Sequence, residues 1–238
     1  MSTCLDTILR DGERGLSLSL GASGTSFGTK WDGIGPSSSI NDNADGLVFS
    51  AATSPSGDDL SNWSVDSGDR AVHSMTNSLL RTIRIDNKKL GTLDQWAKTG
   101  ISAPSSRHGG VILRMSDSAT DKVSGYRLVW DRIDGSNSQL WLERIARGTD
   151  TRSAKLWEET PVSNITSNIA LHAVNDGSDV ILTMYREGVE VGSYTDTGPD
   201  VIQDGYNAGA LLQNNSSGYG IRHLFAWDNG QEEPPHTS

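Results

Sequence analysis

The sequence predicts an all-β protein in which two antiparallel sheets pack against each other as a sandwich. From about residue 46 onward, apolar residues recur with a period of two, and helical periodicity is almost absent. Clusters of Gly, Asn, Asp and Ser interrupt these runs at the spacing expected for turns between short strands. With 238 residues, of which 26 are Gly and 34% are hydrophobic, the chain can form one large β domain with a sizeable core.

Short alternating or apolar runs define the individual strands. The predicted strands cover residues 46–52, 70–75, 79–85, 110–115, 125–131, 139–145, 154–158, 169–174, 180–186, 189–194, 207–212 and 220–227. Gly-containing links at 134–137 and 186–188 predict hairpins, because Gly adopts positive φ without steric cost.

Side-chain parity assigns faces to two neighbouring strands. In 125–131, Tyr126, Leu128 and Trp130 share one face, and Arg127 and Val129 share the other. In the next strand, the spacing of Leu140, Leu142 and Ile145 predicts a bulge or irregularity near the end of 139–145. One face of each strand is therefore expected to pack in the core.

The first residues differ from the rest of the chain. Thr3 is a candidate helix cap, followed by the apolar residues Leu5, Ile8 and Leu9, and residues 16–20 alternate as a strand does. We therefore divide the chain into an N-terminal arm or docking segment (1–28), a β domain (29–230) and a polar C-terminal tail (231–238). The alternative for the arm is a first strand with a frayed end.

Charge and composition exclude several classes of function. The net charge of −10 repels phosphate backbones and anionic lipids, which disfavours nucleic-acid binding. No apolar run is long enough to cross a bilayer, so membrane insertion is not expected. The acidic start of the chain lacks a signal-peptide pattern, which predicts synthesis and retention in a cytoplasm. Cys4 is the only cysteine, so no intrachain disulfide is expected.

The order of several motifs resembles a known superfamily. Lys-Trp-Asp at 30–32 is followed by Gly-Gly-Val-Ile-Leu-Arg-Met at 109–115, then by Gly-Tyr-Arg-Leu-Val-Trp at 125–130, and the chain closes on Phe-Ala-Trp at 225–227. This pattern resembles the concanavalin A-like, laminin G-like jelly-roll superfamily over residues 29–230, of the kind found in phage and viral particle proteins and in secreted sugar-binding proteins. The resemblance implies two face-to-face sheets, a ligand groove on the concave sheet and rim loops able to hold calcium.

An aromatic side chain beside planar polar groups is the pattern that recognises a sugar ring. Trp141 alternates against Leu140 and Leu142 and is predicted to face outward, with Arg127 and Arg144 near it. These three residues are the candidate carbohydrate site. The alternative is that the tryptophans of this region pack in the core, as the parity of Trp130 indicates.

Two oxygen-rich clusters are candidate calcium sites. The run 41–46 supplies Asn41, Asn43 and Asp45 at alternate positions, but the twelfth position is Ala52 and not the expected Glu. Asp131 and Asp134 form a second cluster in a predicted hairpin. The alternative for both is an Asx-rich turn without a metal.

No catalytic constellation is recognisable. Retaining glycosidases need two carboxylates about 5–5.5 Å apart, and no such strand motif or Gly-x-Ser-x-Gly elbow occurs. The five His residues are scattered without metal-ligand spacing. The sequence therefore predicts a protein without enzymatic activity.

These observations leave three hypotheses. The first is a structural or decoration protein on the surface of a phage or virus particle, docked to capsid or tail proteins through Leu5, Ile8 and Leu9 and able to adhere to a cell-surface glycan. The second is a free carbohydrate-binding module or lectin, and the third is a glycan-active hydrolase or lyase. By analogy with other particle jelly rolls, a homo-oligomer is also expected, since symmetric contacts cover sheet edges.

Overall fold

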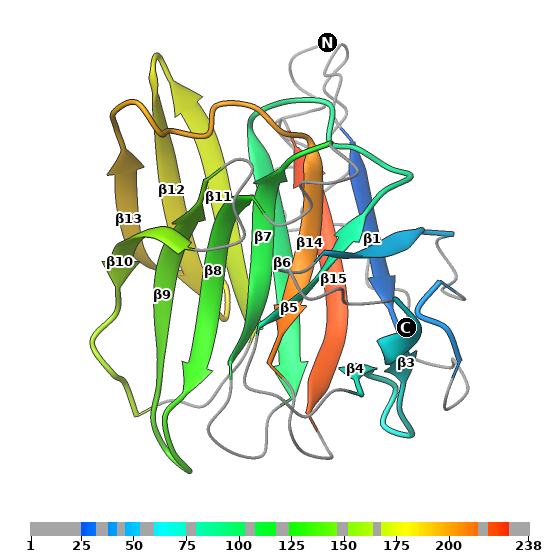
Figure 1. Cartoon of the computed structure of the whole chain (residues 1–238). Helices are drawn as coiled ribbons and strands as arrows, with labels where there is room; N and C mark the ends of the chain where they lie inside the picture. The colour runs from blue at the N-terminus through cyan, green and yellow to red at the C-terminus, as the bar shows by residue number, and fades with distance from the viewer. Residues whose placement is uncertain are drawn as a thin grey trace, which may run out of the picture.

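The computed structural model describes residues 25–31, 38–41, 46–52, 60–74, 80–102, 108–117, 124–146, 152–163, 168–213 and 219–228. Figure 1 shows a β sandwich whose described part contains one short 3-10 turn, η1 (Leu60–Asn62), beside the strands. The strands are β1 (Ser26–Lys30), β2 (Phe49–Ala52), β3 (Trp63–Val65), β4 (Ala71–His73), β5 (Arg81–Ile85), β6 (Gln95–Ser102), β7 (His108–Met115), β8 (Gly125–Arg132), β9 (Ser138–Ile145), β10 (Arg152–Glu158), β11 (Asn168–Asp176), β12 (Asp179–Arg186), β13 (Val189–Asp196), β14 (Asn207–Leu212) and β15 (Gly220–Asp228). Within these ranges, no helical segment has the length and apolarity needed to span a membrane.

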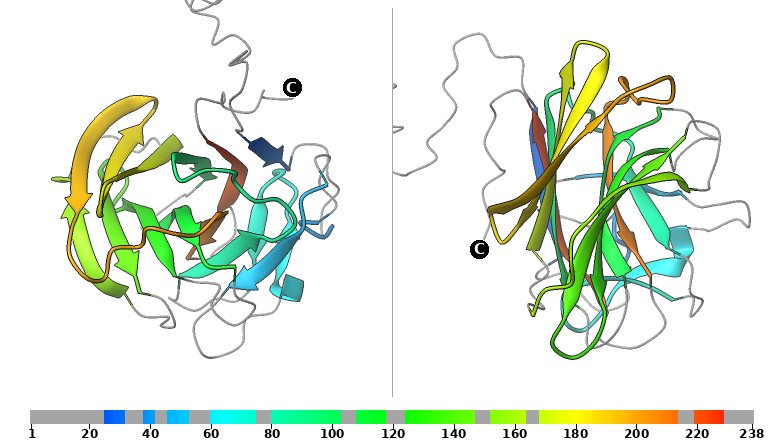
Figure 2. Two further views of the ribbon diagram at one scale, coloured as in Figure 1. Left: turned by 90° about the horizontal axis from the view of Figure 1, so that it is seen from above. Right: turned by 90° about the vertical axis from the view of Figure 1, so that its left-hand side faces the viewer.

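The strands form two sheets that lie face to face (Figure 2). Sheet A has eight strands in the order β13-β12-β11-β6-β15-β4-β3, with β1 also paired to β15. Sheet B has seven strands in the order β10-β9-β8-β7-β14-β5-β2. All strand pairs recorded among the described residues are antiparallel, as in the pairings of β8 with β9 and of β11 with β12. The predicted two-sheet antiparallel sandwich is therefore confirmed.

Tight turns join neighbouring strands where the sequence predicts them. The β8–β9 turn closes at Asp134, whose carboxylate accepts hydrogen bonds from the backbone N–H groups of Ser136 (2.7 Å) and Asn137 (2.8 Å). The β12–β13 turn places Glu187 at φ 50° and Gly188 at φ 77°, the two positive values that a type I′ hairpin requires. Both predicted hairpins are confirmed.

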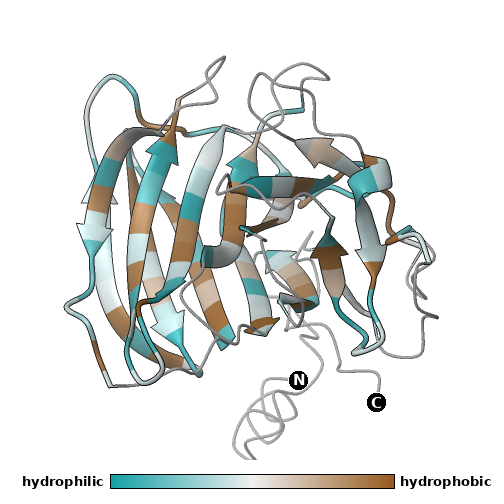
Figure 3. Ribbon diagram, turned by 60° about the horizontal axis from the view of Figure 1, so that its bottom comes forward, coloured by the Kyte–Doolittle hydropathy of each residue, from teal (hydrophilic) through white to brown (hydrophobic). Residues whose placement is uncertain are grey.

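Alternation along the strands places apolar side chains between the sheets. Tyr126, Leu128 and Trp130 of β8 are all buried in the main core, whereas Arg127 and Val129 point to the other side of sheet B. Figure 3 shows the result as bands of apolar and polar residues that alternate along the strands. The parity assigned to this strand from the sequence is therefore confirmed.

Arg114 interrupts this alternation near the end of β7. Its φ is 58°, and its fully buried guanidinium donates to the side-chain oxygen of Asn175 (2.6 Å) and to the carbonyls of Ile202 (3.2 Å) and Leu93. Burial lowers the pKa of Arg114 to about 10. The residue thus ties β11 of sheet A and two connecting segments, those that contain Leu93 and Ile202, to sheet B.

All twelve predicted strands have a counterpart among the fifteen observed ones. The sequence analysis missed β1, β3 and β6, because they are short or interrupted by polar residues and Gly. The predicted boundary between arm and domain, at residue 28, falls inside β1, whose pairing with β15 begins at Ser26. The candidate helix, the candidate strand 16–20 and the docking residues Leu5, Ile8 and Leu9 lie outside the described residues.

Candidate functional site

The candidate site lies on the side of sheet B that faces away from sheet A, here called the outer face of sheet B. Cross-strand partners in an antiparallel sheet share a face, and Arg127 of β8 lies opposite Glu143 of β9, as Val129 lies opposite Trp141. A small apolar cluster, separate from the main core, forms the floor of this face. Its members are Ile112, Met115, Val129, Trp141 and Leu211.

Glu143 is the centre of the polar contacts on this face. Its Oε2 accepts a hydrogen bond from Nη2 of Arg127 at 2.6 Å, and its Oε1 accepts one from the indole N–H of Trp141 at 2.8 Å. The side chains of Arg127 and Glu143 are only 9% and 5% exposed. Such short, charge-assisted bonds fix the orientation of the guanidinium, the carboxylate and the indole together.

A second polar group lies beside Trp141. Nε2 of His108 is 3.0 Å from Oδ1 of Asp131, and the amide of Gln139 donates to Oδ2 of the same carboxylate at 3.2 Å. The rings of His108 and Trp141 meet edge to face, with centroids 4.8 Å apart. The indole of Trp141 thus contacts both polar groups, Glu143 of the first through a hydrogen bond and His108 of the second through a ring contact.

Lys155 of β10, the cross-strand partner of Glu143, places its ammonium over the Trp141 ring. Its ammonium lies 5.3 Å from the centre of the Trp141 ring, a cation–π distance, and it also forms an ion pair with Glu158. Lys155 is 35% exposed, in contrast to Trp141, which is only 9% exposed. The face therefore groups guanidinium, carboxylate, amide and imidazole groups around an indole that Lys155 partly covers, with Arg127 and Glu143 nearly buried.

Arg144 lies on the other side of sheet B. Its Nη1 donates to both carboxylate oxygens of Asp196 in sheet A, at 2.7 and 2.8 Å, and the hydroxyl of Tyr126 donates to the same carboxylate at 2.7 Å. Burial, together with this hydrogen bond, raises the pKa of Tyr126 above its usual value. The predicted grouping of Arg144 with Trp141 and Arg127 is therefore wrong, since Arg144 links the two sheets inside the sandwich.

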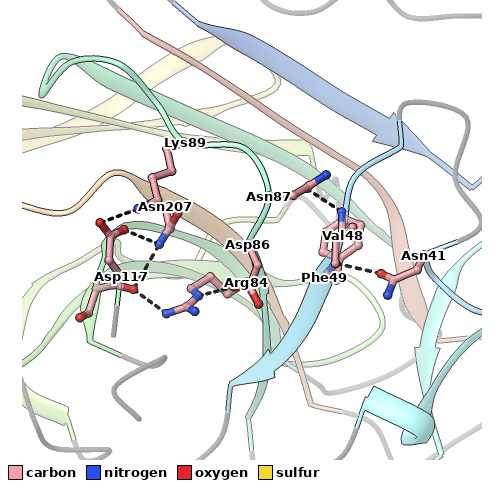
Figure 4. Close-up of polar contacts among 10 residues, drawn as sticks. Asn41, Val48, Phe49, Arg84, Asp86, Asn87, Lys89, Asp117 and Asn207 are labelled. Carbon is pink, nitrogen blue, oxygen red and sulfur yellow. Dashed lines mark hydrogen bonds and ion pairs between the residues drawn. The ribbon is translucent and has the colours of Figure 1, made fainter. Parts of the chain in front are cut away.

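The candidate calcium ligands take part in turns and in bonds within the protein. Oδ1 of Asn41 accepts from the backbone N–H of Phe49 at 2.8 Å (Figure 4). Asn43 and Asp45 lie outside the described residues. Asp134 caps its own hairpin, and Asp131 is bound by His108 and Gln139. Among the described residues, no group of three or more His, Cys, Asp or Glu side chains is arranged to hold a metal ion.

Figure 4 also shows the polar contacts near the start of β14. Arg84 pairs with Asp86 at 2.7 Å, and Lys89 pairs with Asp117 at 2.7 Å. The side-chain amide of Asn207 donates to Asp117 at 2.8 Å. These carboxylates are therefore bound to cations and amides of the protein itself.

The outer face of sheet A has a different construction. Trp227, Trp96 and His172 are cross-strand partners on β15, β6 and β11, and we call these three residues with Tyr185 the aromatic ladder. The rings of Trp96 and His172 stack at 4.0 Å, and those of Trp96 and Trp227 stack at 5.6 Å. Tyr185 contacts Trp96 at 5.1 Å, and Nε2 of His172 lies 2.7 Å from Oδ1 of Asp94.

Sequence reasoning identified Trp141 and Arg127 as neighbours but missed Glu143, His108, Gln139 and Lys155. The signal that could have found Glu143 is its position two residues after Trp141 on one strand, which puts both side chains on one face. His108 could not be found in this way, because its place beside Trp141 depends on how β7 pairs with β8.

No protein-family model matches the sequence, and no curated protein matches it. Several solved structures are similar in fold. The CBM2 module of the evolved Dit of Lactobacillus casei BL23 phage J-1 has a TM-score of 0.51 at 9% identity, covering 89% of this chain and 99% of that one. The alginate lyase Aly36B, with an alginate trisaccharide, has a TM-score of 0.49 at 12% identity, covering 86% and 96%.

A legume lectin-like domain from Entamoeba histolytica has a TM-score of 0.44 at 11% identity, covering 76% of this chain and 90% of that one. At such identities, a match shows shared architecture and nothing about activity. The similarity to the phage module is one of fold alone, and it agrees with the sandwich of two antiparallel sheets described above.

Proposed function

We propose that the protein is a glycan-binding module without catalytic activity, and that the outer face of sheet B binds the sugar. The observation that carries this proposal is the gathering of Arg127, Glu143, Asp131 and Gln139 around Trp141 on adjacent strands. Carboxylates, amides and guanidinium groups form hydrogen bonds with pairs of sugar hydroxyls, while an indole contacts the apolar side of the ring. The similar phage module, a CBM2 by name, supports the same assignment.

Access to Trp141 depends on Lys155. Among the described residues, the contacts of the lysine side chain are with the 45% exposed Glu158 and with the indole itself. Exposed pairs of this kind contribute at most about 1 kcal/mol. A sugar ring can therefore displace the ammonium at small cost and contact the indole in its place.

The carboxylates of this face suit binding better than hydrolysis. A glycosidase needs one carboxyl group that delivers a proton and a second that attacks the sugar or activates water. Both oxygens of Glu143 are held by Arg127 and Trp141, and both oxygens of Asp131 are held by His108 and Gln139. These bonds favour fixed hydrogen-bonding groups over groups that exchange protons with a substrate.

A glycan array followed by calorimetry on each hit tests the proposal. We expect Gln139→Ala to weaken binding at least about tenfold, because it removes an amide from the face while Arg127 and Glu143 stay in place. Thr183→Ala, on the outer face of sheet A, is the matched control and should bind as the native protein does. Absence of any glycan ligand would overturn the proposal, and release of shortened sugars from a ligand would overturn its non-catalytic part.

We also propose that the module is carried on the surface of a phage or virus particle, attached to capsid or tail proteins through its N-terminal segment. Two observations support this role: the apolar residues Leu5, Ile8 and Leu9 in a segment otherwise unlike the β domain, and the phage origin of the similar module. The test is co-sedimentation of the full chain with particles, compared with a chain lacking residues 1–15. Loss of co-sedimentation on deletion would support the role, and a native chain found only in soluble fractions would contradict it.

A further inference from the structure

Among the side chains that the structure describes on β7 to β10, the charges on the outer face of sheet B are matched within the protein. Among the described residues of β7 to β10, three pairs lie on this face: Arg127 with Glu143 at 2.6 Å, His108 with Asp131 at 3.0 Å, and Lys155 with Glu158. These six groups comprise two permanent cations, three carboxylates and one histidine. In either protonation state of His108, they leave no excess positive charge for an anionic ligand.

The most deeply placed cation is also the least available to a ligand. A uronate or sialate carboxylate would have to compete for Arg127, whose side chain is 9% exposed, with Glu143, whose side chain is 5% exposed and already accepts from its Nη2. Displacement would leave Glu143 as a buried charge without its partner, which is strongly unfavourable. The net charge of −10 adds long-range repulsion toward any acidic polysaccharide.

Neutral sugars need no such displacement. A hydroxyl can donate to a carboxylate oxygen that already accepts one hydrogen bond, since each such oxygen has two lone pairs. Glu143 and Asp131 can therefore accept from sugar hydroxyls while Arg127 and His108 stay in place. The paired charges then polarise the hydroxyls without attracting a charged group.

We infer that the ligand of this face is a neutral glycan and that the Arg127–Glu143 pair excludes acidic ones. The inference rests on the proposed glycan binding and adds the chemical class of the ligand. It predicts that affinity changes by less than about twofold between about 50 and 500 mM NaCl, because binding of a neutral ligand is not screened by salt.

The experiment compares matched ligands on the native chain: oligosaccharides of glucose, galactose and mannose, and the corresponding oligouronates, which differ only in carrying a carboxylate at C6. We expect a neutral member to bind and its uronate to bind at least about tenfold more weakly. Equal or tighter binding of the uronate, with affinity falling as salt rises, would overturn the inference and leave the proposed glycan binding intact. Absence of binding by both series would overturn the proposed function itself.

Glu143→Gln tests the cause of the selectivity. This change leaves Arg127 with a neutral neighbour, so binding of the uronate should improve at least about fivefold and become sensitive to salt. Glu190→Gln, an exposed site on β13 of sheet A, makes the same change in net charge and should have no effect on the ratio of the two affinities. If the Glu143→Gln variant folds and the ratio of the two affinities is unchanged, the Arg127–Glu143 pair is not what excludes acidic glycans. If the variant does not fold, the comparison of neutral and acidic sugars on the native chain still decides the class of ligand.

Discussion

The outer faces of the two sheets are built by the same strand alternation but presented to solvent in different ways. On sheet A, Trp227, Trp96 and His172 lie on three adjacent strands and stack ring against ring. On sheet B, the corresponding positions on β8 and β9 carry Arg127, Glu143 and Trp141, joined by hydrogen bonds. One face is thus held by ring contacts and the other by paired charges.

The difference indicates which face suits a sugar. In the aromatic ladder, His172 and Trp227 cover the two faces of Trp96, because β11 and β15 flank β6 and the rings are nearly parallel, at 11° and 6°. A sugar stacks on a ring face, so this central indole is not available to it. On sheet B, the indole is covered by a lysine that can move, and hydrogen-bonding groups surround it. The ring contacts of the ladder are therefore expected to stabilise sheet A, which is why the proposed glycan site is the outer face of sheet B.

The largest effect is expected from removing the central carboxylate of sheet B. Glu143→Ala leaves the guanidinium of Arg127 buried without its ion-pair partner, which should cost about 3–5 kcal/mol in the free energy of unfolding. Urea unfolding of the variant and the native chain measures the difference. Loss of less than about 1 kcal/mol would show that the pair is not held as described.

A double variant provides the control for this prediction. Arg127→Met with Glu143→Leu replaces both charges by apolar groups of similar length and should recover most of the lost stability, because no unmatched charge remains. Glycan binding should be lost in this variant, because the face no longer carries the Arg127 guanidinium and the Glu143 carboxylate.

A smaller loss is expected on sheet A. Trp96→Ala removes three ring contacts, to His172, Trp227 and Tyr185, and should lower the free energy of unfolding by about 2–4 kcal/mol. Because the ladder lies on the other sheet, the folded variant should keep its affinity for a glycan within about twofold. Loss of glycan binding in a folded Trp96→Ala variant would move the site to sheet A.

The sequence predicted the sandwich well because alternation is a local signal that the fold preserves. It missed β6, and with it Trp96, because Lys98, Thr99 and Gly100 dilute the apolar pattern of a strand that is central in sheet A. The strand lies between β11 and β15, two segments distant in the sequence, and no local pattern shows that its neighbours will be Trp227 and His172.

The error at Arg144 has a different cause. The sequence analysis grouped Arg144 with Trp141, and separately expected a bulge or irregularity near the end of β9, a shift that would change the face on which Arg144 lies. In the structure, the pairing of β8 with β9 has no register shift over its whole length, from Gly125 opposite Ile145 to Arg132 opposite Ser138. The register shifts lie instead in the pairing of β10 with β9. Unbroken alternation sends Arg144 inward with Leu140 and Leu142, where Asp196 of sheet A neutralises it. The partner that stabilises an inward arginine is far away in the sequence and could not be predicted.

An intermediate effect is expected at the indole that joins the two polar groups. Trp141→Phe keeps an aromatic ring but removes the N–H that donates to Glu143, so we expect a loss of about 1–2 kcal/mol in the free energy of unfolding. Calorimetry should also show weaker glycan binding, since Glu143 loses a group that orients it. Unchanged affinity would show that sugar binding does not depend on the hydrogen bond from this indole to Glu143.

The smallest effect is expected at the hairpin that sets the register of β8 and β9, and so places Glu143 opposite Arg127. Hydrogen bonds from the side chain of Asn137 and from the backbone N–H groups of Ser136 and Asn137 lower the pKa of Asp134 below its usual value. A carboxyl group with a lowered pKa in the folded state stabilises the protein above its unfolded pKa, near 3.9, and this contribution is lost as pH falls through the folded pKa. Asp134→Ala should therefore lower the Tm slightly at pH 7, and the difference from the native chain should shrink as the medium becomes strongly acidic. Because the Asp134 carboxylate is already bound inside its own turn, adding calcium or a chelator should leave the difference in Tm unchanged. A difference in Tm that depends on calcium would instead identify Asp134 as a metal ligand.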